Sequence, residues 1–309
     1  MKTKIWVALL ALYIVWGSTY LGIRFAVETI PPFLQAGLRF LISGVILMVW
    51  RRAAGDEMPT RKQWKSLAII GTLLLLGGNG LVSFAEQRIA SGVAALIVGT
   101  VPLWLVFIEA VRPGGVKPTW QAIVGLIVGF GGIYLLIGPS ELTGKLQFDL
   151  IGTVAVVIAA FLWSIGSIYS RSAELPQSAL MMTGGEMLAG SIPIFIVSLL
   201  LGEWKTFSLT QVSAQSWLAL IYLIAFGSMI GFVSYIWLLQ TAPVSLVATY
   251  AYVNPLVAVF LGNWFAKEPL TPRILVAAGI IIGSVVFINS ARRAKVKTEP
   301  LQAVPDDGD

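Results

Sequence analysis

Hydrophobic positions in this chain form long continuous stretches, separated by short segments that carry most of the charges, prolines and polar residues. A helix crosses the hydrocarbon core of a bilayer with roughly 20 apolar residues. Ten stretches approach that length, so the pattern predicts ten membrane-spanning helices. They are Ile5–Gly22, Phe33–Trp50, Trp64–Ser83, Ser91–Val111, Thr119–Ile137, Leu150–Tyr169, Ala179–Leu201, Ser216–Leu239, Val244–Ala266 and Ile274–Asn289.

The second half of the chain repeats the first half. A shift of 147 residues places the first two predicted helices on the sixth and seventh, and a shift of 153 aligns the third and fourth with the eighth and ninth. The aligned pairs include Trp16 with Trp163, Arg39 with Glu186, Gly78 with Gly231 and Pro102 with Pro255. Because five is an odd number, the second copy must cross the membrane in the opposite direction. The predicted fold class is therefore an all-α integral membrane protein with ten helices in two inverted five-helix repeats.

The same alignment sets the predicted domain boundaries. The first repeat covers residues 1–137, a linker covers 138–149, and the second repeat covers 150–289. Residues 290–309 are polar and charged and are predicted to form a disordered cytoplasmic tail. The fifth and tenth helices have no ionisable residue in their interior and carry spaced glycines. We expect these two helices at the periphery or at a dimer contact.

Charged residues give the predicted orientation. Lysine and arginine favour the cytoplasmic side of a membrane. With the N-terminus inside, 14 of them fall in inner segments and 6 in outer segments, so both termini are predicted to be cytoplasmic. The chain is 57% hydrophobic and 12% charged, which leaves too little polar surface for a water-soluble globule. The net charge of +6 does not indicate nucleic-acid binding, because the basic residues lie in short loops and tails.

Two residue types missing from the sequence restrict its chemistry. The chain has no cysteine and no histidine, so thiolate and imidazole chemistry is not available and proton coupling would depend on carboxylates. The sequence also contains no Walker A motif and no cluster with metal-ligand spacing. We therefore expect neither an enzyme nor a cofactor or metal site.

Two ionisable residues lie inside predicted helices at equivalent positions of the two repeats, Arg39 in the second helix and Glu186 in the seventh. Such groups cost about 2.5–3.5 kcal/mol each on insertion scales and usually face protein or a water-filled cavity. One hypothesis places Arg39 against a substrate carboxylate and Glu186 against its amino group or a proton. The alternative is that each only pairs with polar neighbours and holds helices together. For Glu86, which closes the third helix, a solvated interface is favoured.

Several helices contain residues that interrupt regular α-helix. Asn79 follows Gly78 in a glycine-rich stretch, which favours local unwinding or close helix packing. Asn254-Pro255 predicts a kink in the ninth helix because proline has no amide hydrogen, and Pro102 predicts a matching kink in the fourth. Paired breaks are typical of the moving elements of transporters. Gly78, Pro102 and Pro255 are therefore candidate hinges, and Asn79 and Asn254 are candidate binding residues, although kinks without substrate contact are the alternative.

A few aromatic residues lie within predicted helices rather than at the membrane interfaces. They include Trp16, Trp163 and Tyr250. A cavity that stacks an apolar or aromatic substrate would use such rings, whereas packing or lipid contact is their default role. Ser18 follows Trp16 closely and is a candidate for hydrogen bonding across helices or to substrate.

Several short motifs resemble the EamA family of the drug/metabolite transporter superfamily. In the first half they are Ile14-Val15-Trp16-Gly17-Ser18-Thr19-Tyr20, Leu38-Arg39-Phe40 and Val101-Pro102-Leu103. In the second half they are Ala160-Phe161-Leu162-Trp163-Ser164, Val253-Asn254-Pro255-Leu256 and Lys267-Glu268-Pro269-Leu270-Thr271. The resemblance covers nearly the whole chain up to Asn289 and implies ten helices around a central cavity that opens alternately to each side. It departs at Arg112-Pro113-Gly114-Gly115, where Glu268 has no acidic counterpart.

Sequence and resemblance together predict a secondary transporter in the bacterial inner membrane. Its expected activity is export of small metabolites such as amino acids, with substrate bound among helices 1 to 4 and 6 to 9. The energy source would be the substrate gradient or exchange with protons through Glu186. A lipid or isoprenoid translocator and a non-transporting membrane scaffold are the alternatives. The only partners expected are a small-molecule substrate and the lipid bilayer, and the oligomeric state is left open.

Overall fold

The computed structural model describes residues 2–115, 118–137, 149–247 and 249–298, and every regular element among them is a helix. The first half contains α1 (Lys2–Ala26), α2 (Pro32–Ala53), α3 (Arg61–Gly71), η1 (Thr72–Gly80), α4 (Leu81–Ala85), α5 (Ser91–Val98), α6 (Val101–Val111) and α7 (Trp120–Ile137). The second half contains α8 (Leu150–Tyr169), α9 (Ala179–Leu200), α10 (Glu203–Thr206), η3 (Leu209–Gln211), α11 (Ala214–Tyr222), η4 (Leu223–Ile230), α12 (Gly231–Thr241), α13 (Val244–Val247), α14 (Tyr250–Ala266) and α15 (Pro272–Thr298).

The helices have the length and composition of membrane-spanning segments. Among the described residues, seven helical segments are long and apolar enough to cross a bilayer, and they correspond to the first four and the sixth to eighth predicted helices. Shorter apolar helices at Trp120–Leu136 and Pro272–Ile288 correspond to the fifth and tenth, and α13 with α14 covers the ninth. The all-helical membrane character is therefore confirmed. The count of ten spans and their orientation stay predictions.

Helix α15 continues beyond the predicted end of the second repeat. It runs to Thr298, so the first part of the segment predicted to be disordered is helical. The sequence has neither glycine nor proline between Gly283 and Pro300, and nothing in it interrupts the helix before that proline. Residues 299–309 of the predicted tail, and residues 138–148 of the predicted linker, lie outside the described residues.

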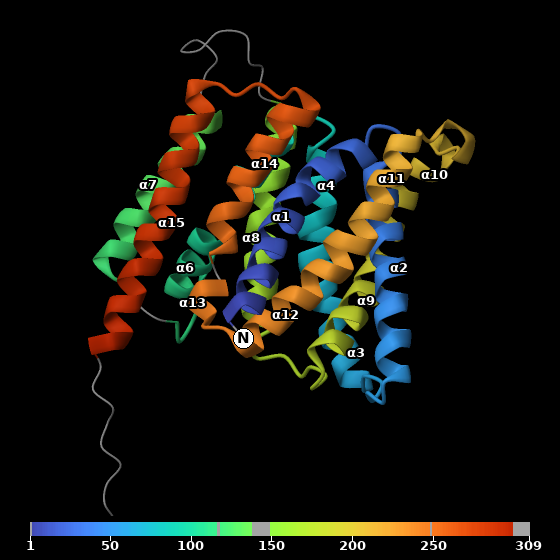
Figure 1. Ribbon diagram of the computed structural model, residues 1–309, viewed down its shortest axis with the longest axis horizontal. Coiled ribbons are helices and arrows are strands. Elements are labelled where there is room, and N and C mark those ends of the chain that lie inside the picture. Colours follow the sequence, from blue (N-terminus) through green and yellow to red (C-terminus); the bar gives the residue numbers. More distant parts are fainter. Residues whose placement is uncertain (1, 116–117, 138–148, 248, 299–309) are drawn as a thin grey trace, which may run out of the picture.

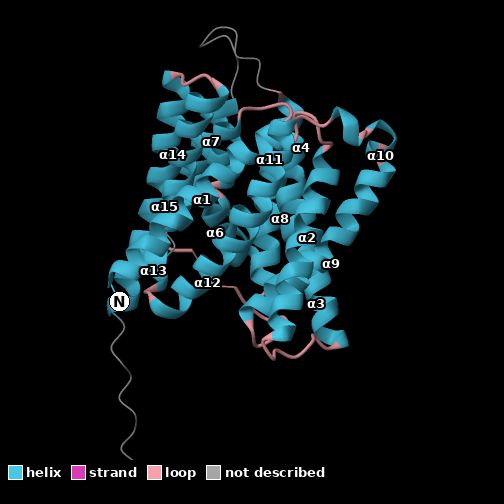
Figure 2. Cartoon of the chain, turned by 45° about the vertical axis from the view of Figure 1, so that its right-hand side comes forward, coloured by secondary structure: helices cyan, strands magenta, loops and turns pink. Residues whose placement is uncertain are grey.

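The helices stand side by side in one bundle, with α7 and α15 together at one edge (Figure 1). Helix α1 begins and α15 ends at the same end of the bundle, and we call this the terminal end. The segment made of α3, η1 and α4 runs from near the terminal end to the opposite end, where α10 also lies. Figure 2 shows the same arrangement after rotation.

Contacts between the two halves are reciprocal. Helix α2 packs along α9, and α7 packs along α15, so each of these pairs joins equivalent helices of the two halves. Helix α1 packs against α14 and against α11, η4 and α12, while α8 packs against α5, α6, η1 and α4. Exchanging the halves converts these contacts of α1 into those of α8, whereas the further contact of α1 with α5 has no comparable counterpart between the described residues of α8 and α14.

Both halves contain π-helix at corresponding places. The glycine-rich stretch around Asn79 forms η1, and the matching part of the second half forms η4. Wider π-helical turns are frequent at functional sites because they rotate the residues that follow. The sequence therefore produces a widened helix at Gly78 rather than an unwound one.

The predicted matching kinks at the two prolines are not equivalent in the structure. The fourth predicted helix is interrupted after Val98, and Pro102 lies in the first turn of α6, where a missing amide hydrogen breaks no helical bond. In the ninth predicted helix, α14 starts at Tyr250, and Pro255 lies inside it. The prolines align in sequence, but the interruption precedes Pro255 by a full turn or more.

Polar residues start several of the helices. Asp149, Ser178 and Ser213 each accept a hydrogen bond from a backbone amide in the first turn of the helix that follows. Thr60 does the same for α3, and Gln63 returns a bond to the amide of Thr60, which completes a capping box. These caps lie at the ends of apolar stretches, where backbone amides have no helical partner.

Helices α2 and α9 bring their backbones into close contact at Gly44. A methyl group at Gly44 would lie 2.6 Å from the backbone nitrogen of Leu188 and 2.9 Å from the carbonyl oxygen of Gly184. Backbone atoms cannot rotate aside as a side chain does, so Gly44→Ala must separate α2 from α9. We expect a loss of about 1–3 kcal/mol in stability, seen as a lower midpoint of thermal unfolding in detergent.

Gly283→Ala is the matched control, because no heavy atom of the described residues outside its own helix lies within 4 Å of a methyl group there. Its midpoint should stay unchanged or rise slightly. Equal destabilisation in the two variants would contradict the close α2–α9 contact.

Candidate functional site

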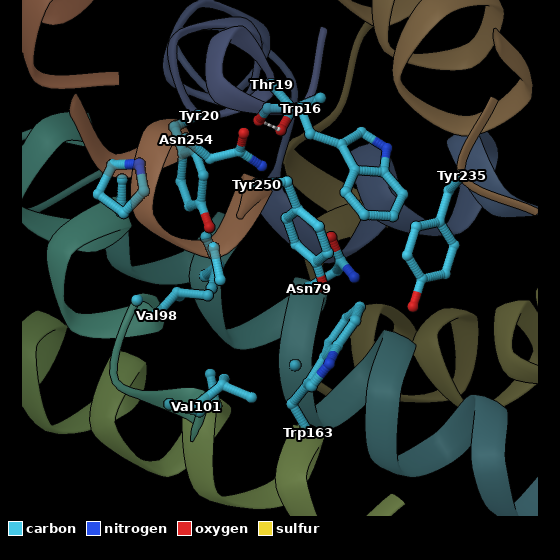
Figure 3. A pocket seen from close by; sticks show the side chains of 18 of the residues that line it. Trp16, Thr19, Tyr20, Asn79, Val98, Val101, Trp163, Tyr235, Tyr250 and Asn254 are labelled. Carbon is cyan, nitrogen blue, oxygen red and sulfur yellow. Dashed lines mark hydrogen bonds between the residues drawn. The ribbon is translucent and has the colours of Figure 1, made fainter. Parts of the chain in front are cut away.

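A central cavity of about 340 Å³ lies between the two halves. This volume is within the range of small-molecule sites, which is about 300–1,000 Å³. Its wall is built from α1, α2, η1, α4, α5, α6, α8, α12, α13 and α14. Among the described residues, none that lines it comes from α7, α9 or α15. Figure 3 shows side chains of both halves facing the same space.

Aromatic rings form one side of the cavity. The ring of Trp16 lies 5.2 Å from those of Tyr235 and Tyr250 and 5.3 Å from that of Phe232, measured between centroids. The indole nitrogen of Trp16 donates to the carbonyl oxygen of Gly227 at 3.2 Å. Figure 3 shows Trp16, Tyr235 and Tyr250 together on this side. The fixed indole gives the cavity a rigid apolar surface.

The two tryptophans aligned by the repeat make exchanged contacts. Trp16 of the first half packs on Gly231 of the second, where a methyl group would lie 2.2 Å from the indole nitrogen. Trp163 of the second half packs on Gly78 of the first, where a methyl group would lie 2.6 Å from ring atom Cε3. Only glycine leaves room for the rings at these two positions. Gly78, a candidate hinge, therefore also accommodates a ring of the cavity wall.

Arg39 supplies positive charge to the cavity wall. Its side chain is buried, its Nε donates to Ser228 Oγ at 2.9 Å, and its guanidinium carbon lies 4.9 Å from the ring centre of Phe40. Its two terminal nitrogens make no hydrogen bond within the part of the chain that the structure describes. None of the described residues that line the cavity is acidic. The site can therefore hold an anionic group.

Two amides add neutral polar groups to the wall. The Nδ2 of Asn79 donates to the carbonyl oxygen of Leu74 at 3.4 Å, within the π-helix η1. The side-chain nitrogen of Asn254, when turned toward α1, lies 3.2 Å from the carbonyl oxygen of Tyr250 and 3.3 Å from that of Tyr13. Both amides line the cavity and can also bond to a solute.

The structure gathers most of the predicted site residues at this cavity. Those that line it are Trp16, Arg39, Gly78, Asn79, Pro102, Trp163, Tyr250, Asn254 and Pro255. Their role in binding stays a prediction. Two candidates, Ser18 and Glu186, do not line the cavity.

Ser18 and Glu186 lie at contacts between helices instead. The hydroxyl of Ser18 donates to the carbonyl oxygen of Ile14 at 2.6 Å and is 2.5 Å from the hydroxyl of Tyr222, which joins α1 to α11. Glu186 is buried on α9, where its backbone packs closely against Gly71 of α3. Its carboxylate has no hydrogen-bond partner among the described residues. Neither side chain is placed to contact a solute in this cavity.

Sequence reasoning missed some residues of the wall. Thr19, Tyr20 and Ile23 line the cavity together with Trp16. These positions are three, four and seven residues after Trp16, which places them on the same face of a helix. Helical periodicity from Trp16 would have identified them.

The interface prediction for Glu86 is wrong. Its side chain has 0% of its surface exposed, and Arg24 donates to its backbone carbonyl. Position at a helix end suggested contact with solvent, but Arg24 of α1 bonds the backbone of Glu86, and Gln87 bonds the carbonyl oxygen of Val27 just after α1. Glu86 is thus a buried acid close behind the cavity wall.

Two acids, the buried Glu203 and the partly buried Glu268, hold helix starts at the end opposite the terminal end. Glu268 accepts from the backbone amides of Ser91 and Gly92 at 2.7 and 3.1 Å, which fixes the start of α5. Glu203 accepts from the amides of Phe33 and Leu34 at 3.2 and 2.8 Å, which fixes the start of α2. Both acids belong to the second half and both helices to the first, so these bonds connect the halves.

The contact of Glu203 with the start of α2 has a weaker counterpart at the terminal end, made by Asp56. Asp56 aligns with Glu203 under the shift of 147 residues and bonds the hydroxyl of Ser178 before α9. Asp56 also bonds Arg51 at 2.9 Å through two nitrogens, and these bonds lower the pKa of Asp56 to about 2. The aspartate is shared between two partners and lies near solvent, whereas Glu203 is buried.

Glu268→Ala should loosen the end opposite the terminal end, because two amides at the start of α5 lose their acceptor. We expect a loss of about 0.5–2 kcal/mol in stability, measured by thermal unfolding in detergent. Glu109→Ala is the control, since Glu109 pairs with the more exposed Arg112 and Arg171. It should cost no more than about 1 kcal/mol. If Glu268→Ala unfolds at the same temperature as the wild type, Glu268 does not stabilise the start of α5.

Known proteins resemble this chain along almost all of its length. Residues 3–138 and 150–290 each match the EamA-like transporter family. A protein of Escherichia coli K12, named as the uncharacterized inner membrane transporter YedA, is 39% identical over 283 residues, which cover 91% of this chain and 89% of that protein. The uncharacterized transporter YvbV of Bacillus subtilis is 24% identical, with 95% of this chain and 94% of that protein covered.

A solved crystal structure shares the fold. It superposes with a TM-score of 0.62 at 20% identity and covers 96% of this chain and 99% of the other. At this level of identity the likeness concerns the fold alone.

Proposed function

The chain belongs to the EamA-like transporter family, and we propose that it is a secondary transporter that moves small organic solutes through its central cavity. Its location is the bacterial inner membrane, in keeping with the Escherichia coli protein that carries that description. The observation that carries the proposal is a single arginine, Arg39, in a cavity walled by aromatic rings and without acidic residues. The transport direction proposed is export.

The wall favours a solute with an anionic group and an apolar or aromatic body. Arg39 offers two free guanidinium nitrogens to a carboxylate, and such bonds are stronger than those between neutral groups. Trp16 and Trp163 offer flat surfaces for the body of the solute. Asn79 and Asn254 can accept from or donate to its polar groups. Amino acids with large side chains satisfy all three features.

Alternating access between two inverted repeats is the proposed mechanism. The reciprocal helix contacts, the π-helices at corresponding places and the exchanged Trp16–Gly231 and Trp163–Gly78 contacts all support a two-fold relation between the halves. A central site at the interface of such halves is opened to each side by rocking of one half against the other. Ten membrane spans and two cytoplasmic termini complete the proposed arrangement.

The structure fits a state closed at the end opposite the terminal end. There, Glu203 connects the halves with a buried hydrogen bond and Glu268 with a partly buried one. The cavity wall instead extends along α12 to Leu239 and includes Val247 of α13, and both helices lie toward the terminal end (Figure 1). We propose that the cavity opens at the terminal end, on the cytoplasmic side.

The solute gradient supplies the energy in the simplest form of the proposal. Exchange with protons is the other form, for which sequence alone favours Glu186. If Glu186 carries the proton, the rate of zwitterion transport must differ between the wild type and Glu186→Gln over about pH 6–8. Identical rates across this range would exclude Glu186 as the coupling residue.

Arg39→Ala should abolish solute transport, because the carboxylate loses its charged partner. Phenylalanine counterflow into proteoliposomes is the assay, with reconstitution verified by size-exclusion chromatography. Loss of one hydrogen-bonded charge pair predicts a fall of roughly tenfold or more in transport rate at low solute concentration. Arg171→Ala is the matched control, because its side chain is 61% exposed and pairs only at the surface with Glu109.

The alternative functions give different results in the same preparation. A lipid translocator would scramble labelled lipid in these vesicles and show no counterflow of any amino acid in a broad panel. A membrane scaffold would show neither activity, in wild type or in Arg39→Ala. Counterflow that persists in Arg39→Ala would overturn the proposed anion site.

The side on which the cavity opens can be measured with single cysteines, because the chain has none of its own. Leu239→Cys lines the cavity toward the terminal end and should react with a membrane-impermeant maleimide added from the cytoplasmic side. Ile23→Cys, at a wall residue with 2% of its surface exposed, should react far more slowly. Faster labelling of Ile23→Cys, or labelling of Leu239→Cys only from the periplasmic side, would contradict this arrangement.

A further inference from the structure

Glu86 is a buried acid that the transport pathway described above does not use. It directly follows α4 and lies just beyond the membrane-spanning segment Arg61–Ala85. Its side chain has 0% exposure, and neither carboxylate oxygen has a hydrogen-bond partner in the described parts of the chain. A buried carboxylate without partners is costly when ionised and much less costly when it carries a proton.

Charged and titratable groups from three elements face Glu86. From α1, Arg24 donates to its backbone carbonyl, and Tyr20 interacts with its carboxylate. From α2, the cavity residue Arg39 attracts it, and from the loop after α14, Glu268 repels it. Burial raises the pKa of Glu86 well above its ordinary value, and Glu268 raises it further, whereas Arg24 and Arg39 oppose the shift. Arg88, two residues on, is engaged by Asp149 at 3.6 Å.

The position of Glu86 connects it with both the cavity and the closed end. Arg39 and Tyr20 line the cavity, so the carboxylate of Glu86 interacts with two residues of the wall while remaining outside it. Glu268 is the acid that holds the start of α5 and connects the two halves. A change of charge on Glu86 therefore alters the electrostatic energy of Arg39 at the anion site and that of Glu268 at the contact between the halves.

We propose that Glu86 is a proton-binding site linked to the Arg39 anion site, so that a proton on Glu86 and an anion at Arg39 each favour binding of the other. The proton is taken from bulk water and returned to it, and no other bond changes. The proton site itself does not depend on the nature of the solute. Its role in coupling rests on the proposed transport function.

The linkage follows from the charges. With the cavity empty, Arg39 attracts the ionised Glu86 and so favours release of the proton. An anion held by Arg39 cancels that attraction, and Glu86 then binds its proton more tightly. Because linkage is reciprocal, a protonated Glu86 must raise the affinity of Arg39 for the anion by the same factor.

Glu186 is the competing carboxylate and lacks these connections. It lies on α9, outside the residues that line the cavity. No charged side chain of the described residues forms an ion pair with it. The charge of Glu86 acts on Arg39 and that of Glu186 is not among those that do, so protonation of Glu186 would leave an anion at Arg39 unaffected.

Infrared difference spectroscopy tests the proton site without any solute. The full chain reconstituted in lipid is titrated between about pH 6 and 9, and the carbonyl band of protonated carboxyl groups is followed. We expect a component that titrates above the range of an ordinary glutamate in the wild type, persists in Glu186→Gln and is absent in Glu86→Gln. Glu86→Asp should shift the component without abolishing it, which separates a titration from misfolding of one variant. A component that is the same in wild type and Glu86→Gln would overturn the proposal.

Binding of radiolabelled benzoate tests the linkage, since this aromatic anion stays ionised throughout the range. Wild-type affinity should rise roughly five- to tenfold as the pH falls from about 9 to about 6. Glu86→Gln should bind with the higher affinity at every pH, Glu109→Gln should keep the wild-type profile, and Arg39→Ala should not bind. A profile that becomes flat in Glu186→Gln instead of Glu86→Gln would overturn the linkage.

The two experiments separate failure of this proposal from failure of the transport function. If benzoate does not bind to the wild type, the anion site and its linkage are both rejected, while the infrared titration still decides the proton site. If phenylalanine counterflow is present but the infrared component is unchanged in Glu86→Gln, transport stands and the proton site is rejected.

Discussion

Within a bilayer, polar groups have almost no water to bond with, so each needs a partner inside the protein. This constraint explains why charged residues from distant parts of the chain meet in the interior. Glu203 and Glu268 bond free amides at the starts of α2 and α5, and Arg24 bonds the backbone carbonyl of Glu86. The bonds of Glu203 and Glu268 also join the two halves of the chain. At the end opposite the terminal end, the same side chains therefore bond free backbone amides and hold the two halves together.

Close contact between helices is the second requirement for the cavity. Glycines at Gly44, Gly78 and Gly231 let a backbone or an aromatic ring approach where any side chain would collide. Because lipid is as apolar as a leucine side chain, helices in a membrane associate through such close packing and polar contacts. The rings of Trp16 and Trp163 are thereby fixed on opposite halves. A rigid wall is left around a space that a small solute can enter.

The sequence predicts much of the fold, because the thickness of a bilayer fixes the length of an apolar helix. It also identifies residues such as Arg39 and Asn79, since polar groups within an apolar helix have few stable places other than a cavity or a helix contact. It does not predict which face of a helix a residue occupies when the helix is apolar all round, and so it did not place Glu186. The sequence also wrongly predicted a solvated position for Glu86, because burial at a helix end depends on which distant segments pack against that end.

The aligned positions of Arg39 and Glu186 have a consequence for the kinetics of the carrier. One half contributes a cation to the wall, whereas the equivalent residue of the other half is an acid away from it. Under the proposed alternating access, each side would expose a different half of the wall, only one of which carries a cation, and half-saturation would be reached at different concentrations on the two sides. For a carrier without a coupled ion, detailed balance fixes the ratio of maximal rate to half-saturation concentration at the same value in both directions. The maximal rates of inward and outward transport must therefore differ by the same factor as the half-saturation concentrations. The asymmetry of the wall then sets the concentrations at which the carrier works on each side, while the solute gradient alone sets the direction of net flow.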